Sequence, residues 1–180
     1  KTSLSPFDKT GVYLEGQYVT SDIEVTYDGS HQFLGDILVD LKDVPNEFII
    51  LKDKNIERYL EDYENTPKEV LEKYPQLQKW IENKGAKRKE KVNKDGVHYV
   101  FSEGRMVFPD PTDKPSRTII TAEGGTTASR FKHTVIQKDV LRRLTPVELE
   151  RLNMFPDNHT RLEGVTTSKR AFFMGNALVV

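Results

Sequence analysis

RLTPVELERLNMFPD, residues 143–157, contains the clearest helix start in the chain. Thr145 stands at the N-cap, Pro146 at the first helical position and Glu148 at the third, an arrangement known as a capping box. Leu144, directly before the cap, can pack on the leucine at the fourth helical position as a hydrophobic staple. The stretch therefore predicts a helix that begins at Pro146 and whose direction is fixed at its first turn.

Upstream of this helix, the apolar residues recur with a period of two, which is typical of strands. β-Branched and aromatic residues, joined by links rich in Gly, Pro and Asp, predict short strands over residues 97–101, 106–108, 117–121 and 134–136. The start of the chain has the same character, with extended segments over residues 12–18 and 23–27 and a turn signal at Asp28-Gly29-Ser30.

Between these strand regions, the spacing of apolar residues predicts short helices. One apolar stripe with helical spacing is formed by Ile56, Tyr59, Leu60 and Tyr63. Thr66-Pro67-Lys68-Glu69 predicts a second capping box, and Pro75 ends the helix that follows it. A further stripe, which stops at Gly85, is formed by Leu77, Trp80 and Ile81. Together these patterns predict an α+β fold, a small mixed region of short strands and short helices followed by C-terminal helices.

The length of 180 residues fits one ordinary domain, or one domain with a small appendage. The chain has no cysteine, which excludes a disulfide framework, a thiolate zinc site and a cysteine nucleophile supplied by this chain. No apolar run approaches the roughly 20 residues that a membrane span requires. The chain starts with Lys1-Thr2-Ser3 and ends in the apolar run 177–180, so we expect a piece of a longer intracellular protein.

Charge is distributed unevenly along a chain whose formal net charge is -1. Residues 79–143 contain fifteen basic and eight acidic groups, whereas residues 1–76 contain eight basic and sixteen acidic ones. The densest basic cluster, expected on a flexible loop between a helix and a strand, is formed by Lys84, Lys87, Arg88, Lys89 and Lys91. Such a cluster suits a polyanion such as DNA. A solvated charged face explains the same pattern.

The segment 117–133 combines several groups that bind nucleic acids. A predicted strand leads into Gly124-Gly125, and three hydroxyl residues follow before Arg130, Lys132 and His133. Hydroxyl and guanidinium groups on an adaptable loop suit contacts with phosphates and base edges. The spacing of a P-loop is absent, and a plain hairpin loop explains the two glycines equally well. The four histidines of the chain have no metal-ligand spacing, so no metal site is predicted.

Residues 143–157 resemble motif IX of the DNA cytosine-5 methyltransferases. Ser168-Lys169-Arg170, followed by residues 174–179 (MGNALV), resembles motif X of the same family at the customary short distance. Residues 102–110 and 114–119 are similar to the region directly before motif IX in bacterial restriction–modification enzymes, where the family places its target recognition domain.

The resemblance divides the chain into a target recognition region, residues 1–137, and a motif IX and X segment, residues 138–180. The family's Phe-x-Gly-x-Gly loop, its Pro-Cys nucleophile motif, its Glu-Asn-Val motif and its Gln-x-Arg-x-Arg motif are absent from the chain. The resemblance therefore implies the C-terminal part of such an enzyme. We expect this part to be inactive alone and to pack toward the N-terminal catalytic domain of the same protein.

The patterns above and the resemblance together imply roles for individual residues. The residues expected to bind DNA are Arg105, Arg117, Thr118, Ile119, Thr126, Thr127, Ser129, Arg130, Lys132, Lys87, Arg88 and Lys89. Among these, Thr118-Ile119 matches the pair that the family places near the flipped cytosine. The residues expected at the pocket of the methyl donor S-adenosylmethionine are Gly175, Asn176 and Ala177, where Ala177 replaces the serine often found in the family. No residue of the chain is expected to be catalytic.

The implied function is sequence-specific DNA recognition within a bacterial, cytoplasmic DNA (cytosine-5)-methyltransferase that uses S-adenosylmethionine. Its partner is double-stranded DNA and not a membrane. In such an enzyme this part docks in a DNA groove and helps to hold the target cytosine out of the stack. The alternative is a stand-alone DNA-binding module, or a natural non-catalytic subunit of a two-chain methyltransferase. A hydrolase ranks third, because no nucleophile–base pair stands out in the sequence.

Overall fold

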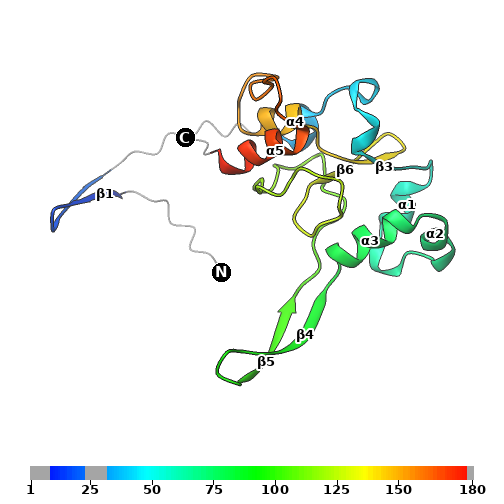
Figure 1. Cartoon of the computed structure of the whole chain (residues 1–180), viewed down its shortest axis with the longest axis horizontal. Helices are drawn as coiled ribbons and strands as arrows, with labels where there is room; N and C mark the ends of the chain where they lie inside the picture. The colour runs from blue at the N-terminus through cyan, green and yellow to red at the C-terminus, as the bar shows by residue number, and fades with distance from the viewer. Residues whose placement is uncertain (1–8, 23–31, 178–180) are drawn as a thin grey trace. The chain divides into compact units, whose positions relative to one another are not determined.

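The computed structural model of the chain describes residues 9–22 and 32–177 and divides into two compact units, Lys1–His31 and Gln32–Val180 (Figure 1). The strand expected at residues 23–27 and the turn expected at residues 28–30 lie outside the described residues. Short strands in small sheets are combined with short helices, which confirms the predicted α+β class.

The described part of the first unit is an antiparallel hairpin. It consists of β1 (Lys9–Leu14) and β2 (Gln17–Asp22). Glu15 and Gly16 form the turn with φ angles of 49° and 81°, the left-handed backbone that tight two-residue hairpin turns require. Residues 12–18 are therefore extended as predicted, except at this turn.

A three-stranded antiparallel sheet organises the second unit. Its strands lie in the order β3 (Ile49–Lys52), β7 (Val140–Arg143) and β6 (Thr134–Gln137). The strand predicted at residues 134–136 is confirmed as β6. The central strand, β7, is buried at all four of its residues and ends directly before the predicted capping box.

Side chains alternate between the two faces of this sheet and enter two separate apolar clusters. Leu141, on one face, belongs to a cluster formed by Leu51, Ile56, Leu60, Tyr63, Leu77, Trp80, Ile81, Phe108 and Leu141. Val135, on the opposite face, belongs to a cluster formed by Leu34, Ile37, Val135, Leu144, Leu149, Ala171 and Met174. The sheet is thus covered on both sides, and the C-terminal helices cover the second side.

The helices on the first side are α1 (Ile56–Leu60), α2 (Lys68–Lys73) and α3 (Pro75–Lys84). The stop signals at Pro75 and Gly85 are confirmed, because α3 begins at the proline and is capped by the glycine. The 3₁₀ turns of the described residues are Leu34–Ile37, Leu41–Asp43, Asn46–Phe48 and Tyr63–Asn65.

The capping box predicted at residues 66–69 is wrong. Pro67 stands at the N-cap of α2, and no side chain among the described residues caps that helix. The hydroxyl of Thr66 instead donates to the carbonyl oxygens of Tyr59 and Tyr63, each at 2.9 Å. The hydroxyl that the local pattern assigned to α2 is therefore bonded to carbonyl oxygens of the two preceding helical turns.

The helices on the second side are α4 (Pro146–Leu152) and α5 (Thr167–Asn176). The capping box at Thr145 is confirmed, because its main-chain N–H donates to Glu148 Oε2 at 2.6 Å and its hydroxyl accepts from the main-chain N–H of Glu148. Leu144 and Leu149 share the second apolar cluster, as the staple predicts.

A two-stranded antiparallel ribbon, formed by β4 (Lys87–Val92) and β5 (His98–Glu103), extends away from the sheet (Figure 1). The strand predicted at residues 97–101 is confirmed in β5. The flexible loop predicted for the lysine cluster is wrong, because most of the cluster forms β4. The aromatic and β-branched residues of β5 give these lysines a pairing partner, and cross-strand pairs stabilise such a ribbon.

The strands predicted at residues 106–108 and 117–121 are also wrong, since neither segment has a hydrogen-bonded neighbouring strand within the described part of the chain. Phe108 instead buries its ring in the first apolar cluster. Residues 116–125, which we call the strap, lie against α5. β-Propensity describes residues that pack well on a half-buried surface, and here that surface is supplied by helices and loops instead of a sheet.

Candidate nucleic-acid interface

The ribbon carries its basic charge on one face. Residues directly opposite each other in an antiparallel pair share a face. We call one face the lysine face, and the register places on it Lys87, Lys89, Lys91, Tyr99, Phe101 and Glu103. The other face is formed by Arg88, Glu90, Val92, His98, Val100 and Ser102. Three lysines and one carboxylate thus lie on the first face, whereas one arginine and one carboxylate balance on the second.

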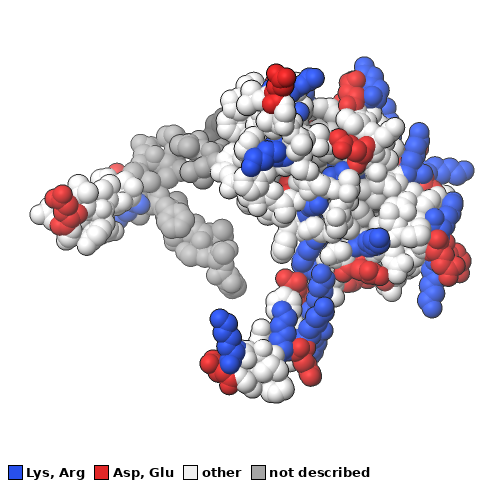
Figure 2. Space-filling model, viewed as in Figure 1, with Lys and Arg blue, Asp and Glu red and all other residues white. Residues whose placement is uncertain are grey.

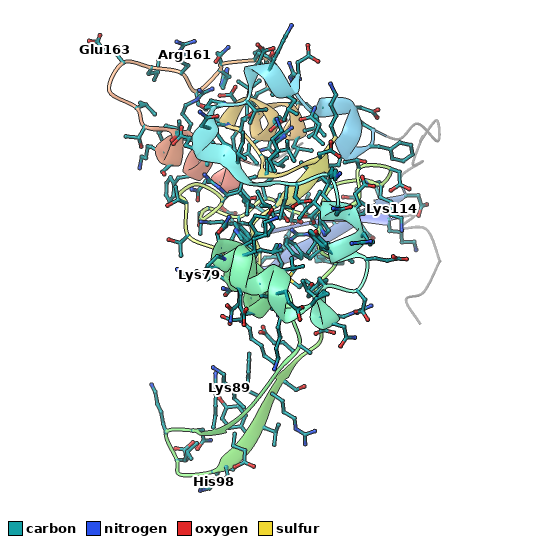
Figure 3. The ribbon with its side chains drawn as sticks, turned by 90° about the vertical axis from the view of Figure 1, so that its right-hand side faces the viewer. Lys79, Lys89, His98, Lys114, Arg161 and Glu163 are labelled. Carbon is teal, nitrogen blue, oxygen red and sulfur yellow. The ribbon has the colours of Figure 1, made fainter. Side chains whose placement is uncertain are left out.

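The lysine face is open to solvent and partly ordered by its aromatic rings. Lys89 and Lys91 are exposed, and Lys91 Nζ lies 4.0 Å from the centroid of the Phe101 ring, a cation–π distance. Basic side chains line the ribbon in Figure 2, and Figure 3 shows Lys89 on the ribbon with His98 near its tip. A two-stranded ribbon is narrow enough to enter the major groove of DNA, where lysines meet phosphates.

Arg130 holds the base of the ribbon. Its side chain is buried, and its guanidinium donates to the carbonyl oxygen of Gly85, two residues before β4 begins, at 2.8 Å. The same guanidinium donates to the carbonyl oxygen of Gly104, directly after β5, and its Nε lies 3.5 Å from Glu103. One planar group with several donors therefore binds both ends of the ribbon.

Lys84 lies in the core beneath the ribbon and not with the exposed lysines among which the sequence placed it. It is fully buried, and its Nζ donates to the carbonyl oxygen of Lys132 at 2.6 Å. Its own carbonyl oxygen accepts from the Tyr63 hydroxyl at 3.0 Å and from the main-chain N–H of Met106 at 2.8 Å. Burial lowers the pKa of Lys84 to about 8.

Lys132 and Arg117 also use their donors within the chain. Lys132 is buried, and its Nζ donates to the carbonyl oxygens of Gly125 at 3.2 Å and Thr127 at 2.8 Å. Burial lowers the pKa of Lys132. Arg117 is half-buried and forms a bidentate ion pair with Asp110, with distances of 2.6 and 3.1 Å. Either side chain would have to exchange these bonds in order to contact DNA.

The strap presents Thr118 and Ile119 at a surface pocket of about 480 Å³. Thr118 is exposed and Ile119 is half-buried. Met174 and Ala177, at the end of α5, line the same pocket. The structure therefore brings the pair expected near the flipped cytosine together with one of the residues expected at the methyl-donor pocket.

Two glycines allow the strap to lie directly on α5. A Cβ atom added to Gly124 would lie 2.6 Å from the Cα of Ser168. A Cβ atom added to Gly175 would collide with backbone atoms of Ile120 and Thr121. Because glycine alone leaves room for such contacts, the strap and α5 meet backbone to backbone near both ends of the helix.

A buried hydrogen-bonded chain connects the two ends of the strap to β6. Ser116 Oγ lies 3.1 Å from His133 Nε2, and His133 Nδ1 lies 3.0 Å from Glu123 Oε1. The main-chain N–H of His133 also donates to Glu123. No local pattern indicates this serine–histidine pair, because the two residues are 17 positions apart. Ser116 Oγ also lies 3.0 Å from the carbonyl oxygen of Arg117, so the chain of bonds fixes the strap in place.

Glu148 connects the first turn of α4 to the sheet. Its carboxylate is fully buried and accepts from the guanidinium of Arg142 at 2.6 and 2.9 Å. It also accepts from the main-chain N–H groups of Val39 at 3.0 Å and Thr145 at 2.6 Å. Since the buried charges are paired and hydrogen-bonded, α4 has a defined position against β7.

Glu150 connects α4 to α5. Its buried carboxylate accepts from the main-chain N–H groups of Asn158 at 2.6 Å and Thr160 at 3.0 Å, and from Arg170 at 2.8 Å. Burial acts to raise the pKa of Glu150, but the hydrogen bonds from Arg170 and Thr160 outweigh it and lower the pKa. One carboxylate thus joins α4 and α5.

The residues that the sequence assigned to DNA differ in exposure. Those on the surface, exposed or half-buried, are Lys87, Arg88, Lys89, Arg105, Arg117, Thr118, Ile119, Thr126, Thr127 and Ser129. Those buried and hydrogen-bonded within the chain are Arg130 and Lys132. Arg105 Nη1 lies 3.5 Å from Asp62 and 3.6 Å from Glu64, so this cation is partly balanced.

The residues assigned to the methyl donor lie together at the end of α5. Gly175 faces the strap, Ala177 lines the 480 Å³ pocket, and the exposed Asn176 donates from Nδ2 to the carbonyl oxygen of Phe172 at 2.9 Å. Within residues 9–22 and 32–177, no helix is long and apolar enough to cross a membrane.

The residues of the lysine face that the sequence did not single out are Tyr99, Phe101 and Glu103, since Lys91 belongs to the basic cluster. The signal that could have found them is the alternation of lysines at positions 87, 89 and 91, which has the period of a strand. Lysine is a poor strand former, so composition favours a loop over this run and hides the separation of its two faces.

Residues 18–180 match the C-5 cytosine-specific DNA methylase family, and the chain belongs to that family. Among curated proteins, the chain is similar to the type II methyltransferase M.Sau3AI of Staphylococcus aureus, with 45% identity over 105 residues. The match covers 58% of this chain and 24% of that methyltransferase, so the chain spans only a small part of its relative. No solved structure matches the chain.

Proposed function

We propose that this chain is the DNA-recognition part of a DNA (cytosine-5)-methyltransferase, the C-terminal portion of a longer enzyme. Residues 1–137 act as the target recognition region, and residues 138–180 pack toward the N-terminal catalytic domain of the same protein. The observation that carries the proposal is the lysine face of the projecting ribbon, in a chain whose residues 18–180 match the methylase family.

In this proposal the ribbon and the strap have different tasks. The lysines of the ribbon neutralise DNA phosphates and hold the duplex without regard to its sequence. Thr118 and Ile119, at their pocket, lie near the cytosine that the complete enzyme turns out of the stack. Arg130 holds the ribbon in place and Lys132 holds the strap, because their donors are occupied by carbonyl oxygens of the chain.

The methyl donor of the complete enzyme is proposed to be S-adenosylmethionine, which supplies the methyl group when it is bound. Ala177 lines the pocket that also contains Thr118 and Ile119, and the amide of Asn176 is exposed beside it. These features fit one edge of a donor site that faces the target base. The nucleophile belongs to the remainder of the enzyme, because this chain has no cysteine.

The test is the salt dependence of duplex DNA binding by the 180-residue chain. Replacing Lys87, Lys89 and Lys91 with Gln should weaken binding to random-sequence duplex. The slope of log affinity against log salt should flatten by about 0.9 for each phosphate that the variant no longer neutralises.

The matched control carries the same change of charge away from the ribbon, at the exposed residues Lys52, Lys54 and Lys68. Its salt slope should equal that of the unmodified chain. Equal flattening in both variants, or none in the ribbon variant, would refute the proposed role of the lysine face.

A further inference from the structure

The middle of the strap has little to hold it except α5. Within residues 32–177, segment 118–122 takes part in a single hydrogen bond, from the main-chain N–H of Glu123 to the carbonyl oxygen of Ile120 at 3.1 Å. The ends are fixed differently, since Arg117 is paired with Asp110 and Glu123 is bonded to His133. The position of Thr118 and Ile119 therefore depends on the surface against which the segment lies.

That surface is the face of α5 that contains Gly175. Any side chain at Gly175 would meet the peptide between Ile120 and Thr121 at less than 3.0 Å, and these are backbone atoms that cannot rotate away. The end of α5 is itself held, because Asn153 Nδ2 donates to the carbonyl oxygen of Met174 at 2.9 Å. Because this end of α5 is fixed, it determines how closely the strap approaches the helix directly beside the pocket.

We propose that Gly175 is a positioning residue for the strap. It lets the Ile120–Thr121 peptide lie directly on α5 and thereby fixes the place of Thr118 and Ile119. The sequence pattern assigned Gly175 to the methyl donor, whereas its Cβ direction is filled by the strap. The meaning of the inference for base recognition rests on the proposed function, but the contact and its structural effect do not.

The size of the effect follows from the contact. Carbon atoms pack at roughly 3.5–4.0 Å, so an alanine at position 175 must lift the strap by about 1 Å. In specific protein–DNA complexes, losing the readout of one base pair costs about tenfold or more in affinity. The change should be local, because the ends of the strap keep their own hydrogen bonds.

The structural test uses methyl and amide NMR of the 180-residue chain. Gly175→Ala should move the methyl signals of Ile119 and Ile120, while those of Ile56 and Ile81, in the other apolar cluster, stay in place. The matched control is Gly104→Ala, because a Cβ there meets no atom within 4 Å. Unmoved Ile119 and Ile120 signals in Gly175→Ala would overturn the inference.

A second measurement serves if Gly175→Ala fails to fold, which loss of the Ile56 and Ile81 signals would reveal. In the unmodified chain, the Hα protons of Gly175 should give a nuclear Overhauser effect to the amide proton of Thr121. Its presence supports the backbone contact, and its absence overturns the inference.

The functional test uses duplexes that the unmodified chain selects from a random pool. Gly175→Ala should lower affinity for the selected duplexes by about tenfold or more, and leave affinity for the unselected pool unchanged. Thr167→Ala, on an exposed residue at the other end of α5, should preserve both. A displaced strap with unchanged preference would overturn the link to recognition. If the unmodified chain selects no duplex, the proposed function fails, whereas the NMR result still decides the positioning role.

Discussion

The guanidinium of Arg130 donates to the carbonyl oxygen of Gly85 over 2.8 Å, at the point where α3 ends and the ribbon begins. The two residues are 45 positions apart in the sequence. Because the same group also reaches Gly104, at the opposite end of the ribbon, one side chain sets the direction in which the lysine face points.

Replacing Arg130 with Lys should loosen the base of the ribbon. A lysine keeps the charge but lacks the planar fork that serves two carbonyl oxygens at once. We expect a loss of about 1–3 kcal/mol of unfolding free energy, and faster amide hydrogen exchange at the ends of β4 and β5. Arg88→Lys, on the exposed opposite face, should change neither quantity. Unchanged amide hydrogen exchange in Arg130→Lys would contradict the role of Arg130 in holding the base of the ribbon.

Replacing Lys84 with Met should alter how stability depends on pH. The pKa of Lys84 falls from 10.5 to about 8 because the side chain is buried, so folding disfavours its charged form. This penalty is complete below pH 8 and disappears as pH rises to 10.5. The unmodified chain should therefore gain up to about 3 kcal/mol relative to the Met variant across that window. Urea unfolding at about pH 7, 9 and 10 measures the difference, and a constant difference would count against the prediction.

Replacing Glu148 with Gln should be among the most destabilising changes of a single charge. The substitution leaves Arg142 fully buried without its counter-charge. Breaking a buried pair in this way costs about 3–5 kcal/mol. Asp157→Asn breaks the pair with Arg151, which is partly exposed, and should cost about 0–1 kcal/mol. Urea unfolding of both variants checks the prediction, which fails if the two losses are equal.

The chain alone should transfer no methyl group. It lacks the cysteine nucleophile, and it provides only one edge of the proposed donor pocket. Incubation with labelled S-adenosylmethionine and a broad mixture of duplex DNA should give background incorporation. Incorporation that copurifies with the chain would show that catalysis does not need the missing motifs.

Local signals were sufficient where the interacting residues are close in sequence. Thr145 and Glu148 cap α4 across three positions, so their pattern alone predicts the helix start. The same pattern at Thr66 failed, because the carbonyl oxygens of Tyr59 and Tyr63 offer its hydroxyl another partner. A capping residue caps its helix only when no competing acceptor takes its side chain, and α2 forms here without a side-chain cap.

The candidate site depends on contacts between distant residues, which a single sequence does not reveal. The period of two at residues 117–121 predicts a strand, yet this segment lies against α5 and pairs with no strand of the described residues. Lys84 belongs to a basic run but is enclosed by residues from other segments, including Lys132. Which lysines are exposed, and which segments pair as strands, is decided only when the whole chain has folded. These properties distinguish the lysine face from nearby basic residues such as Lys84.

The pairing of β6 with β7 determines where hybrid enzymes could be joined. The boundary after residue 137 falls in the turn of that hairpin, and Arg142, beyond it, donates to Gln137, before it, at 2.9 Å. A hybrid joined at this boundary would pair β6 of one enzyme with β7 of another. Its residues 137 and 142 would then come from different proteins. Under the proposed function, exchange of DNA specificity between relatives should therefore succeed when residues 32–177 are inherited as one cassette, because the hairpin and the bond from Arg142 to Gln137 then stay intact.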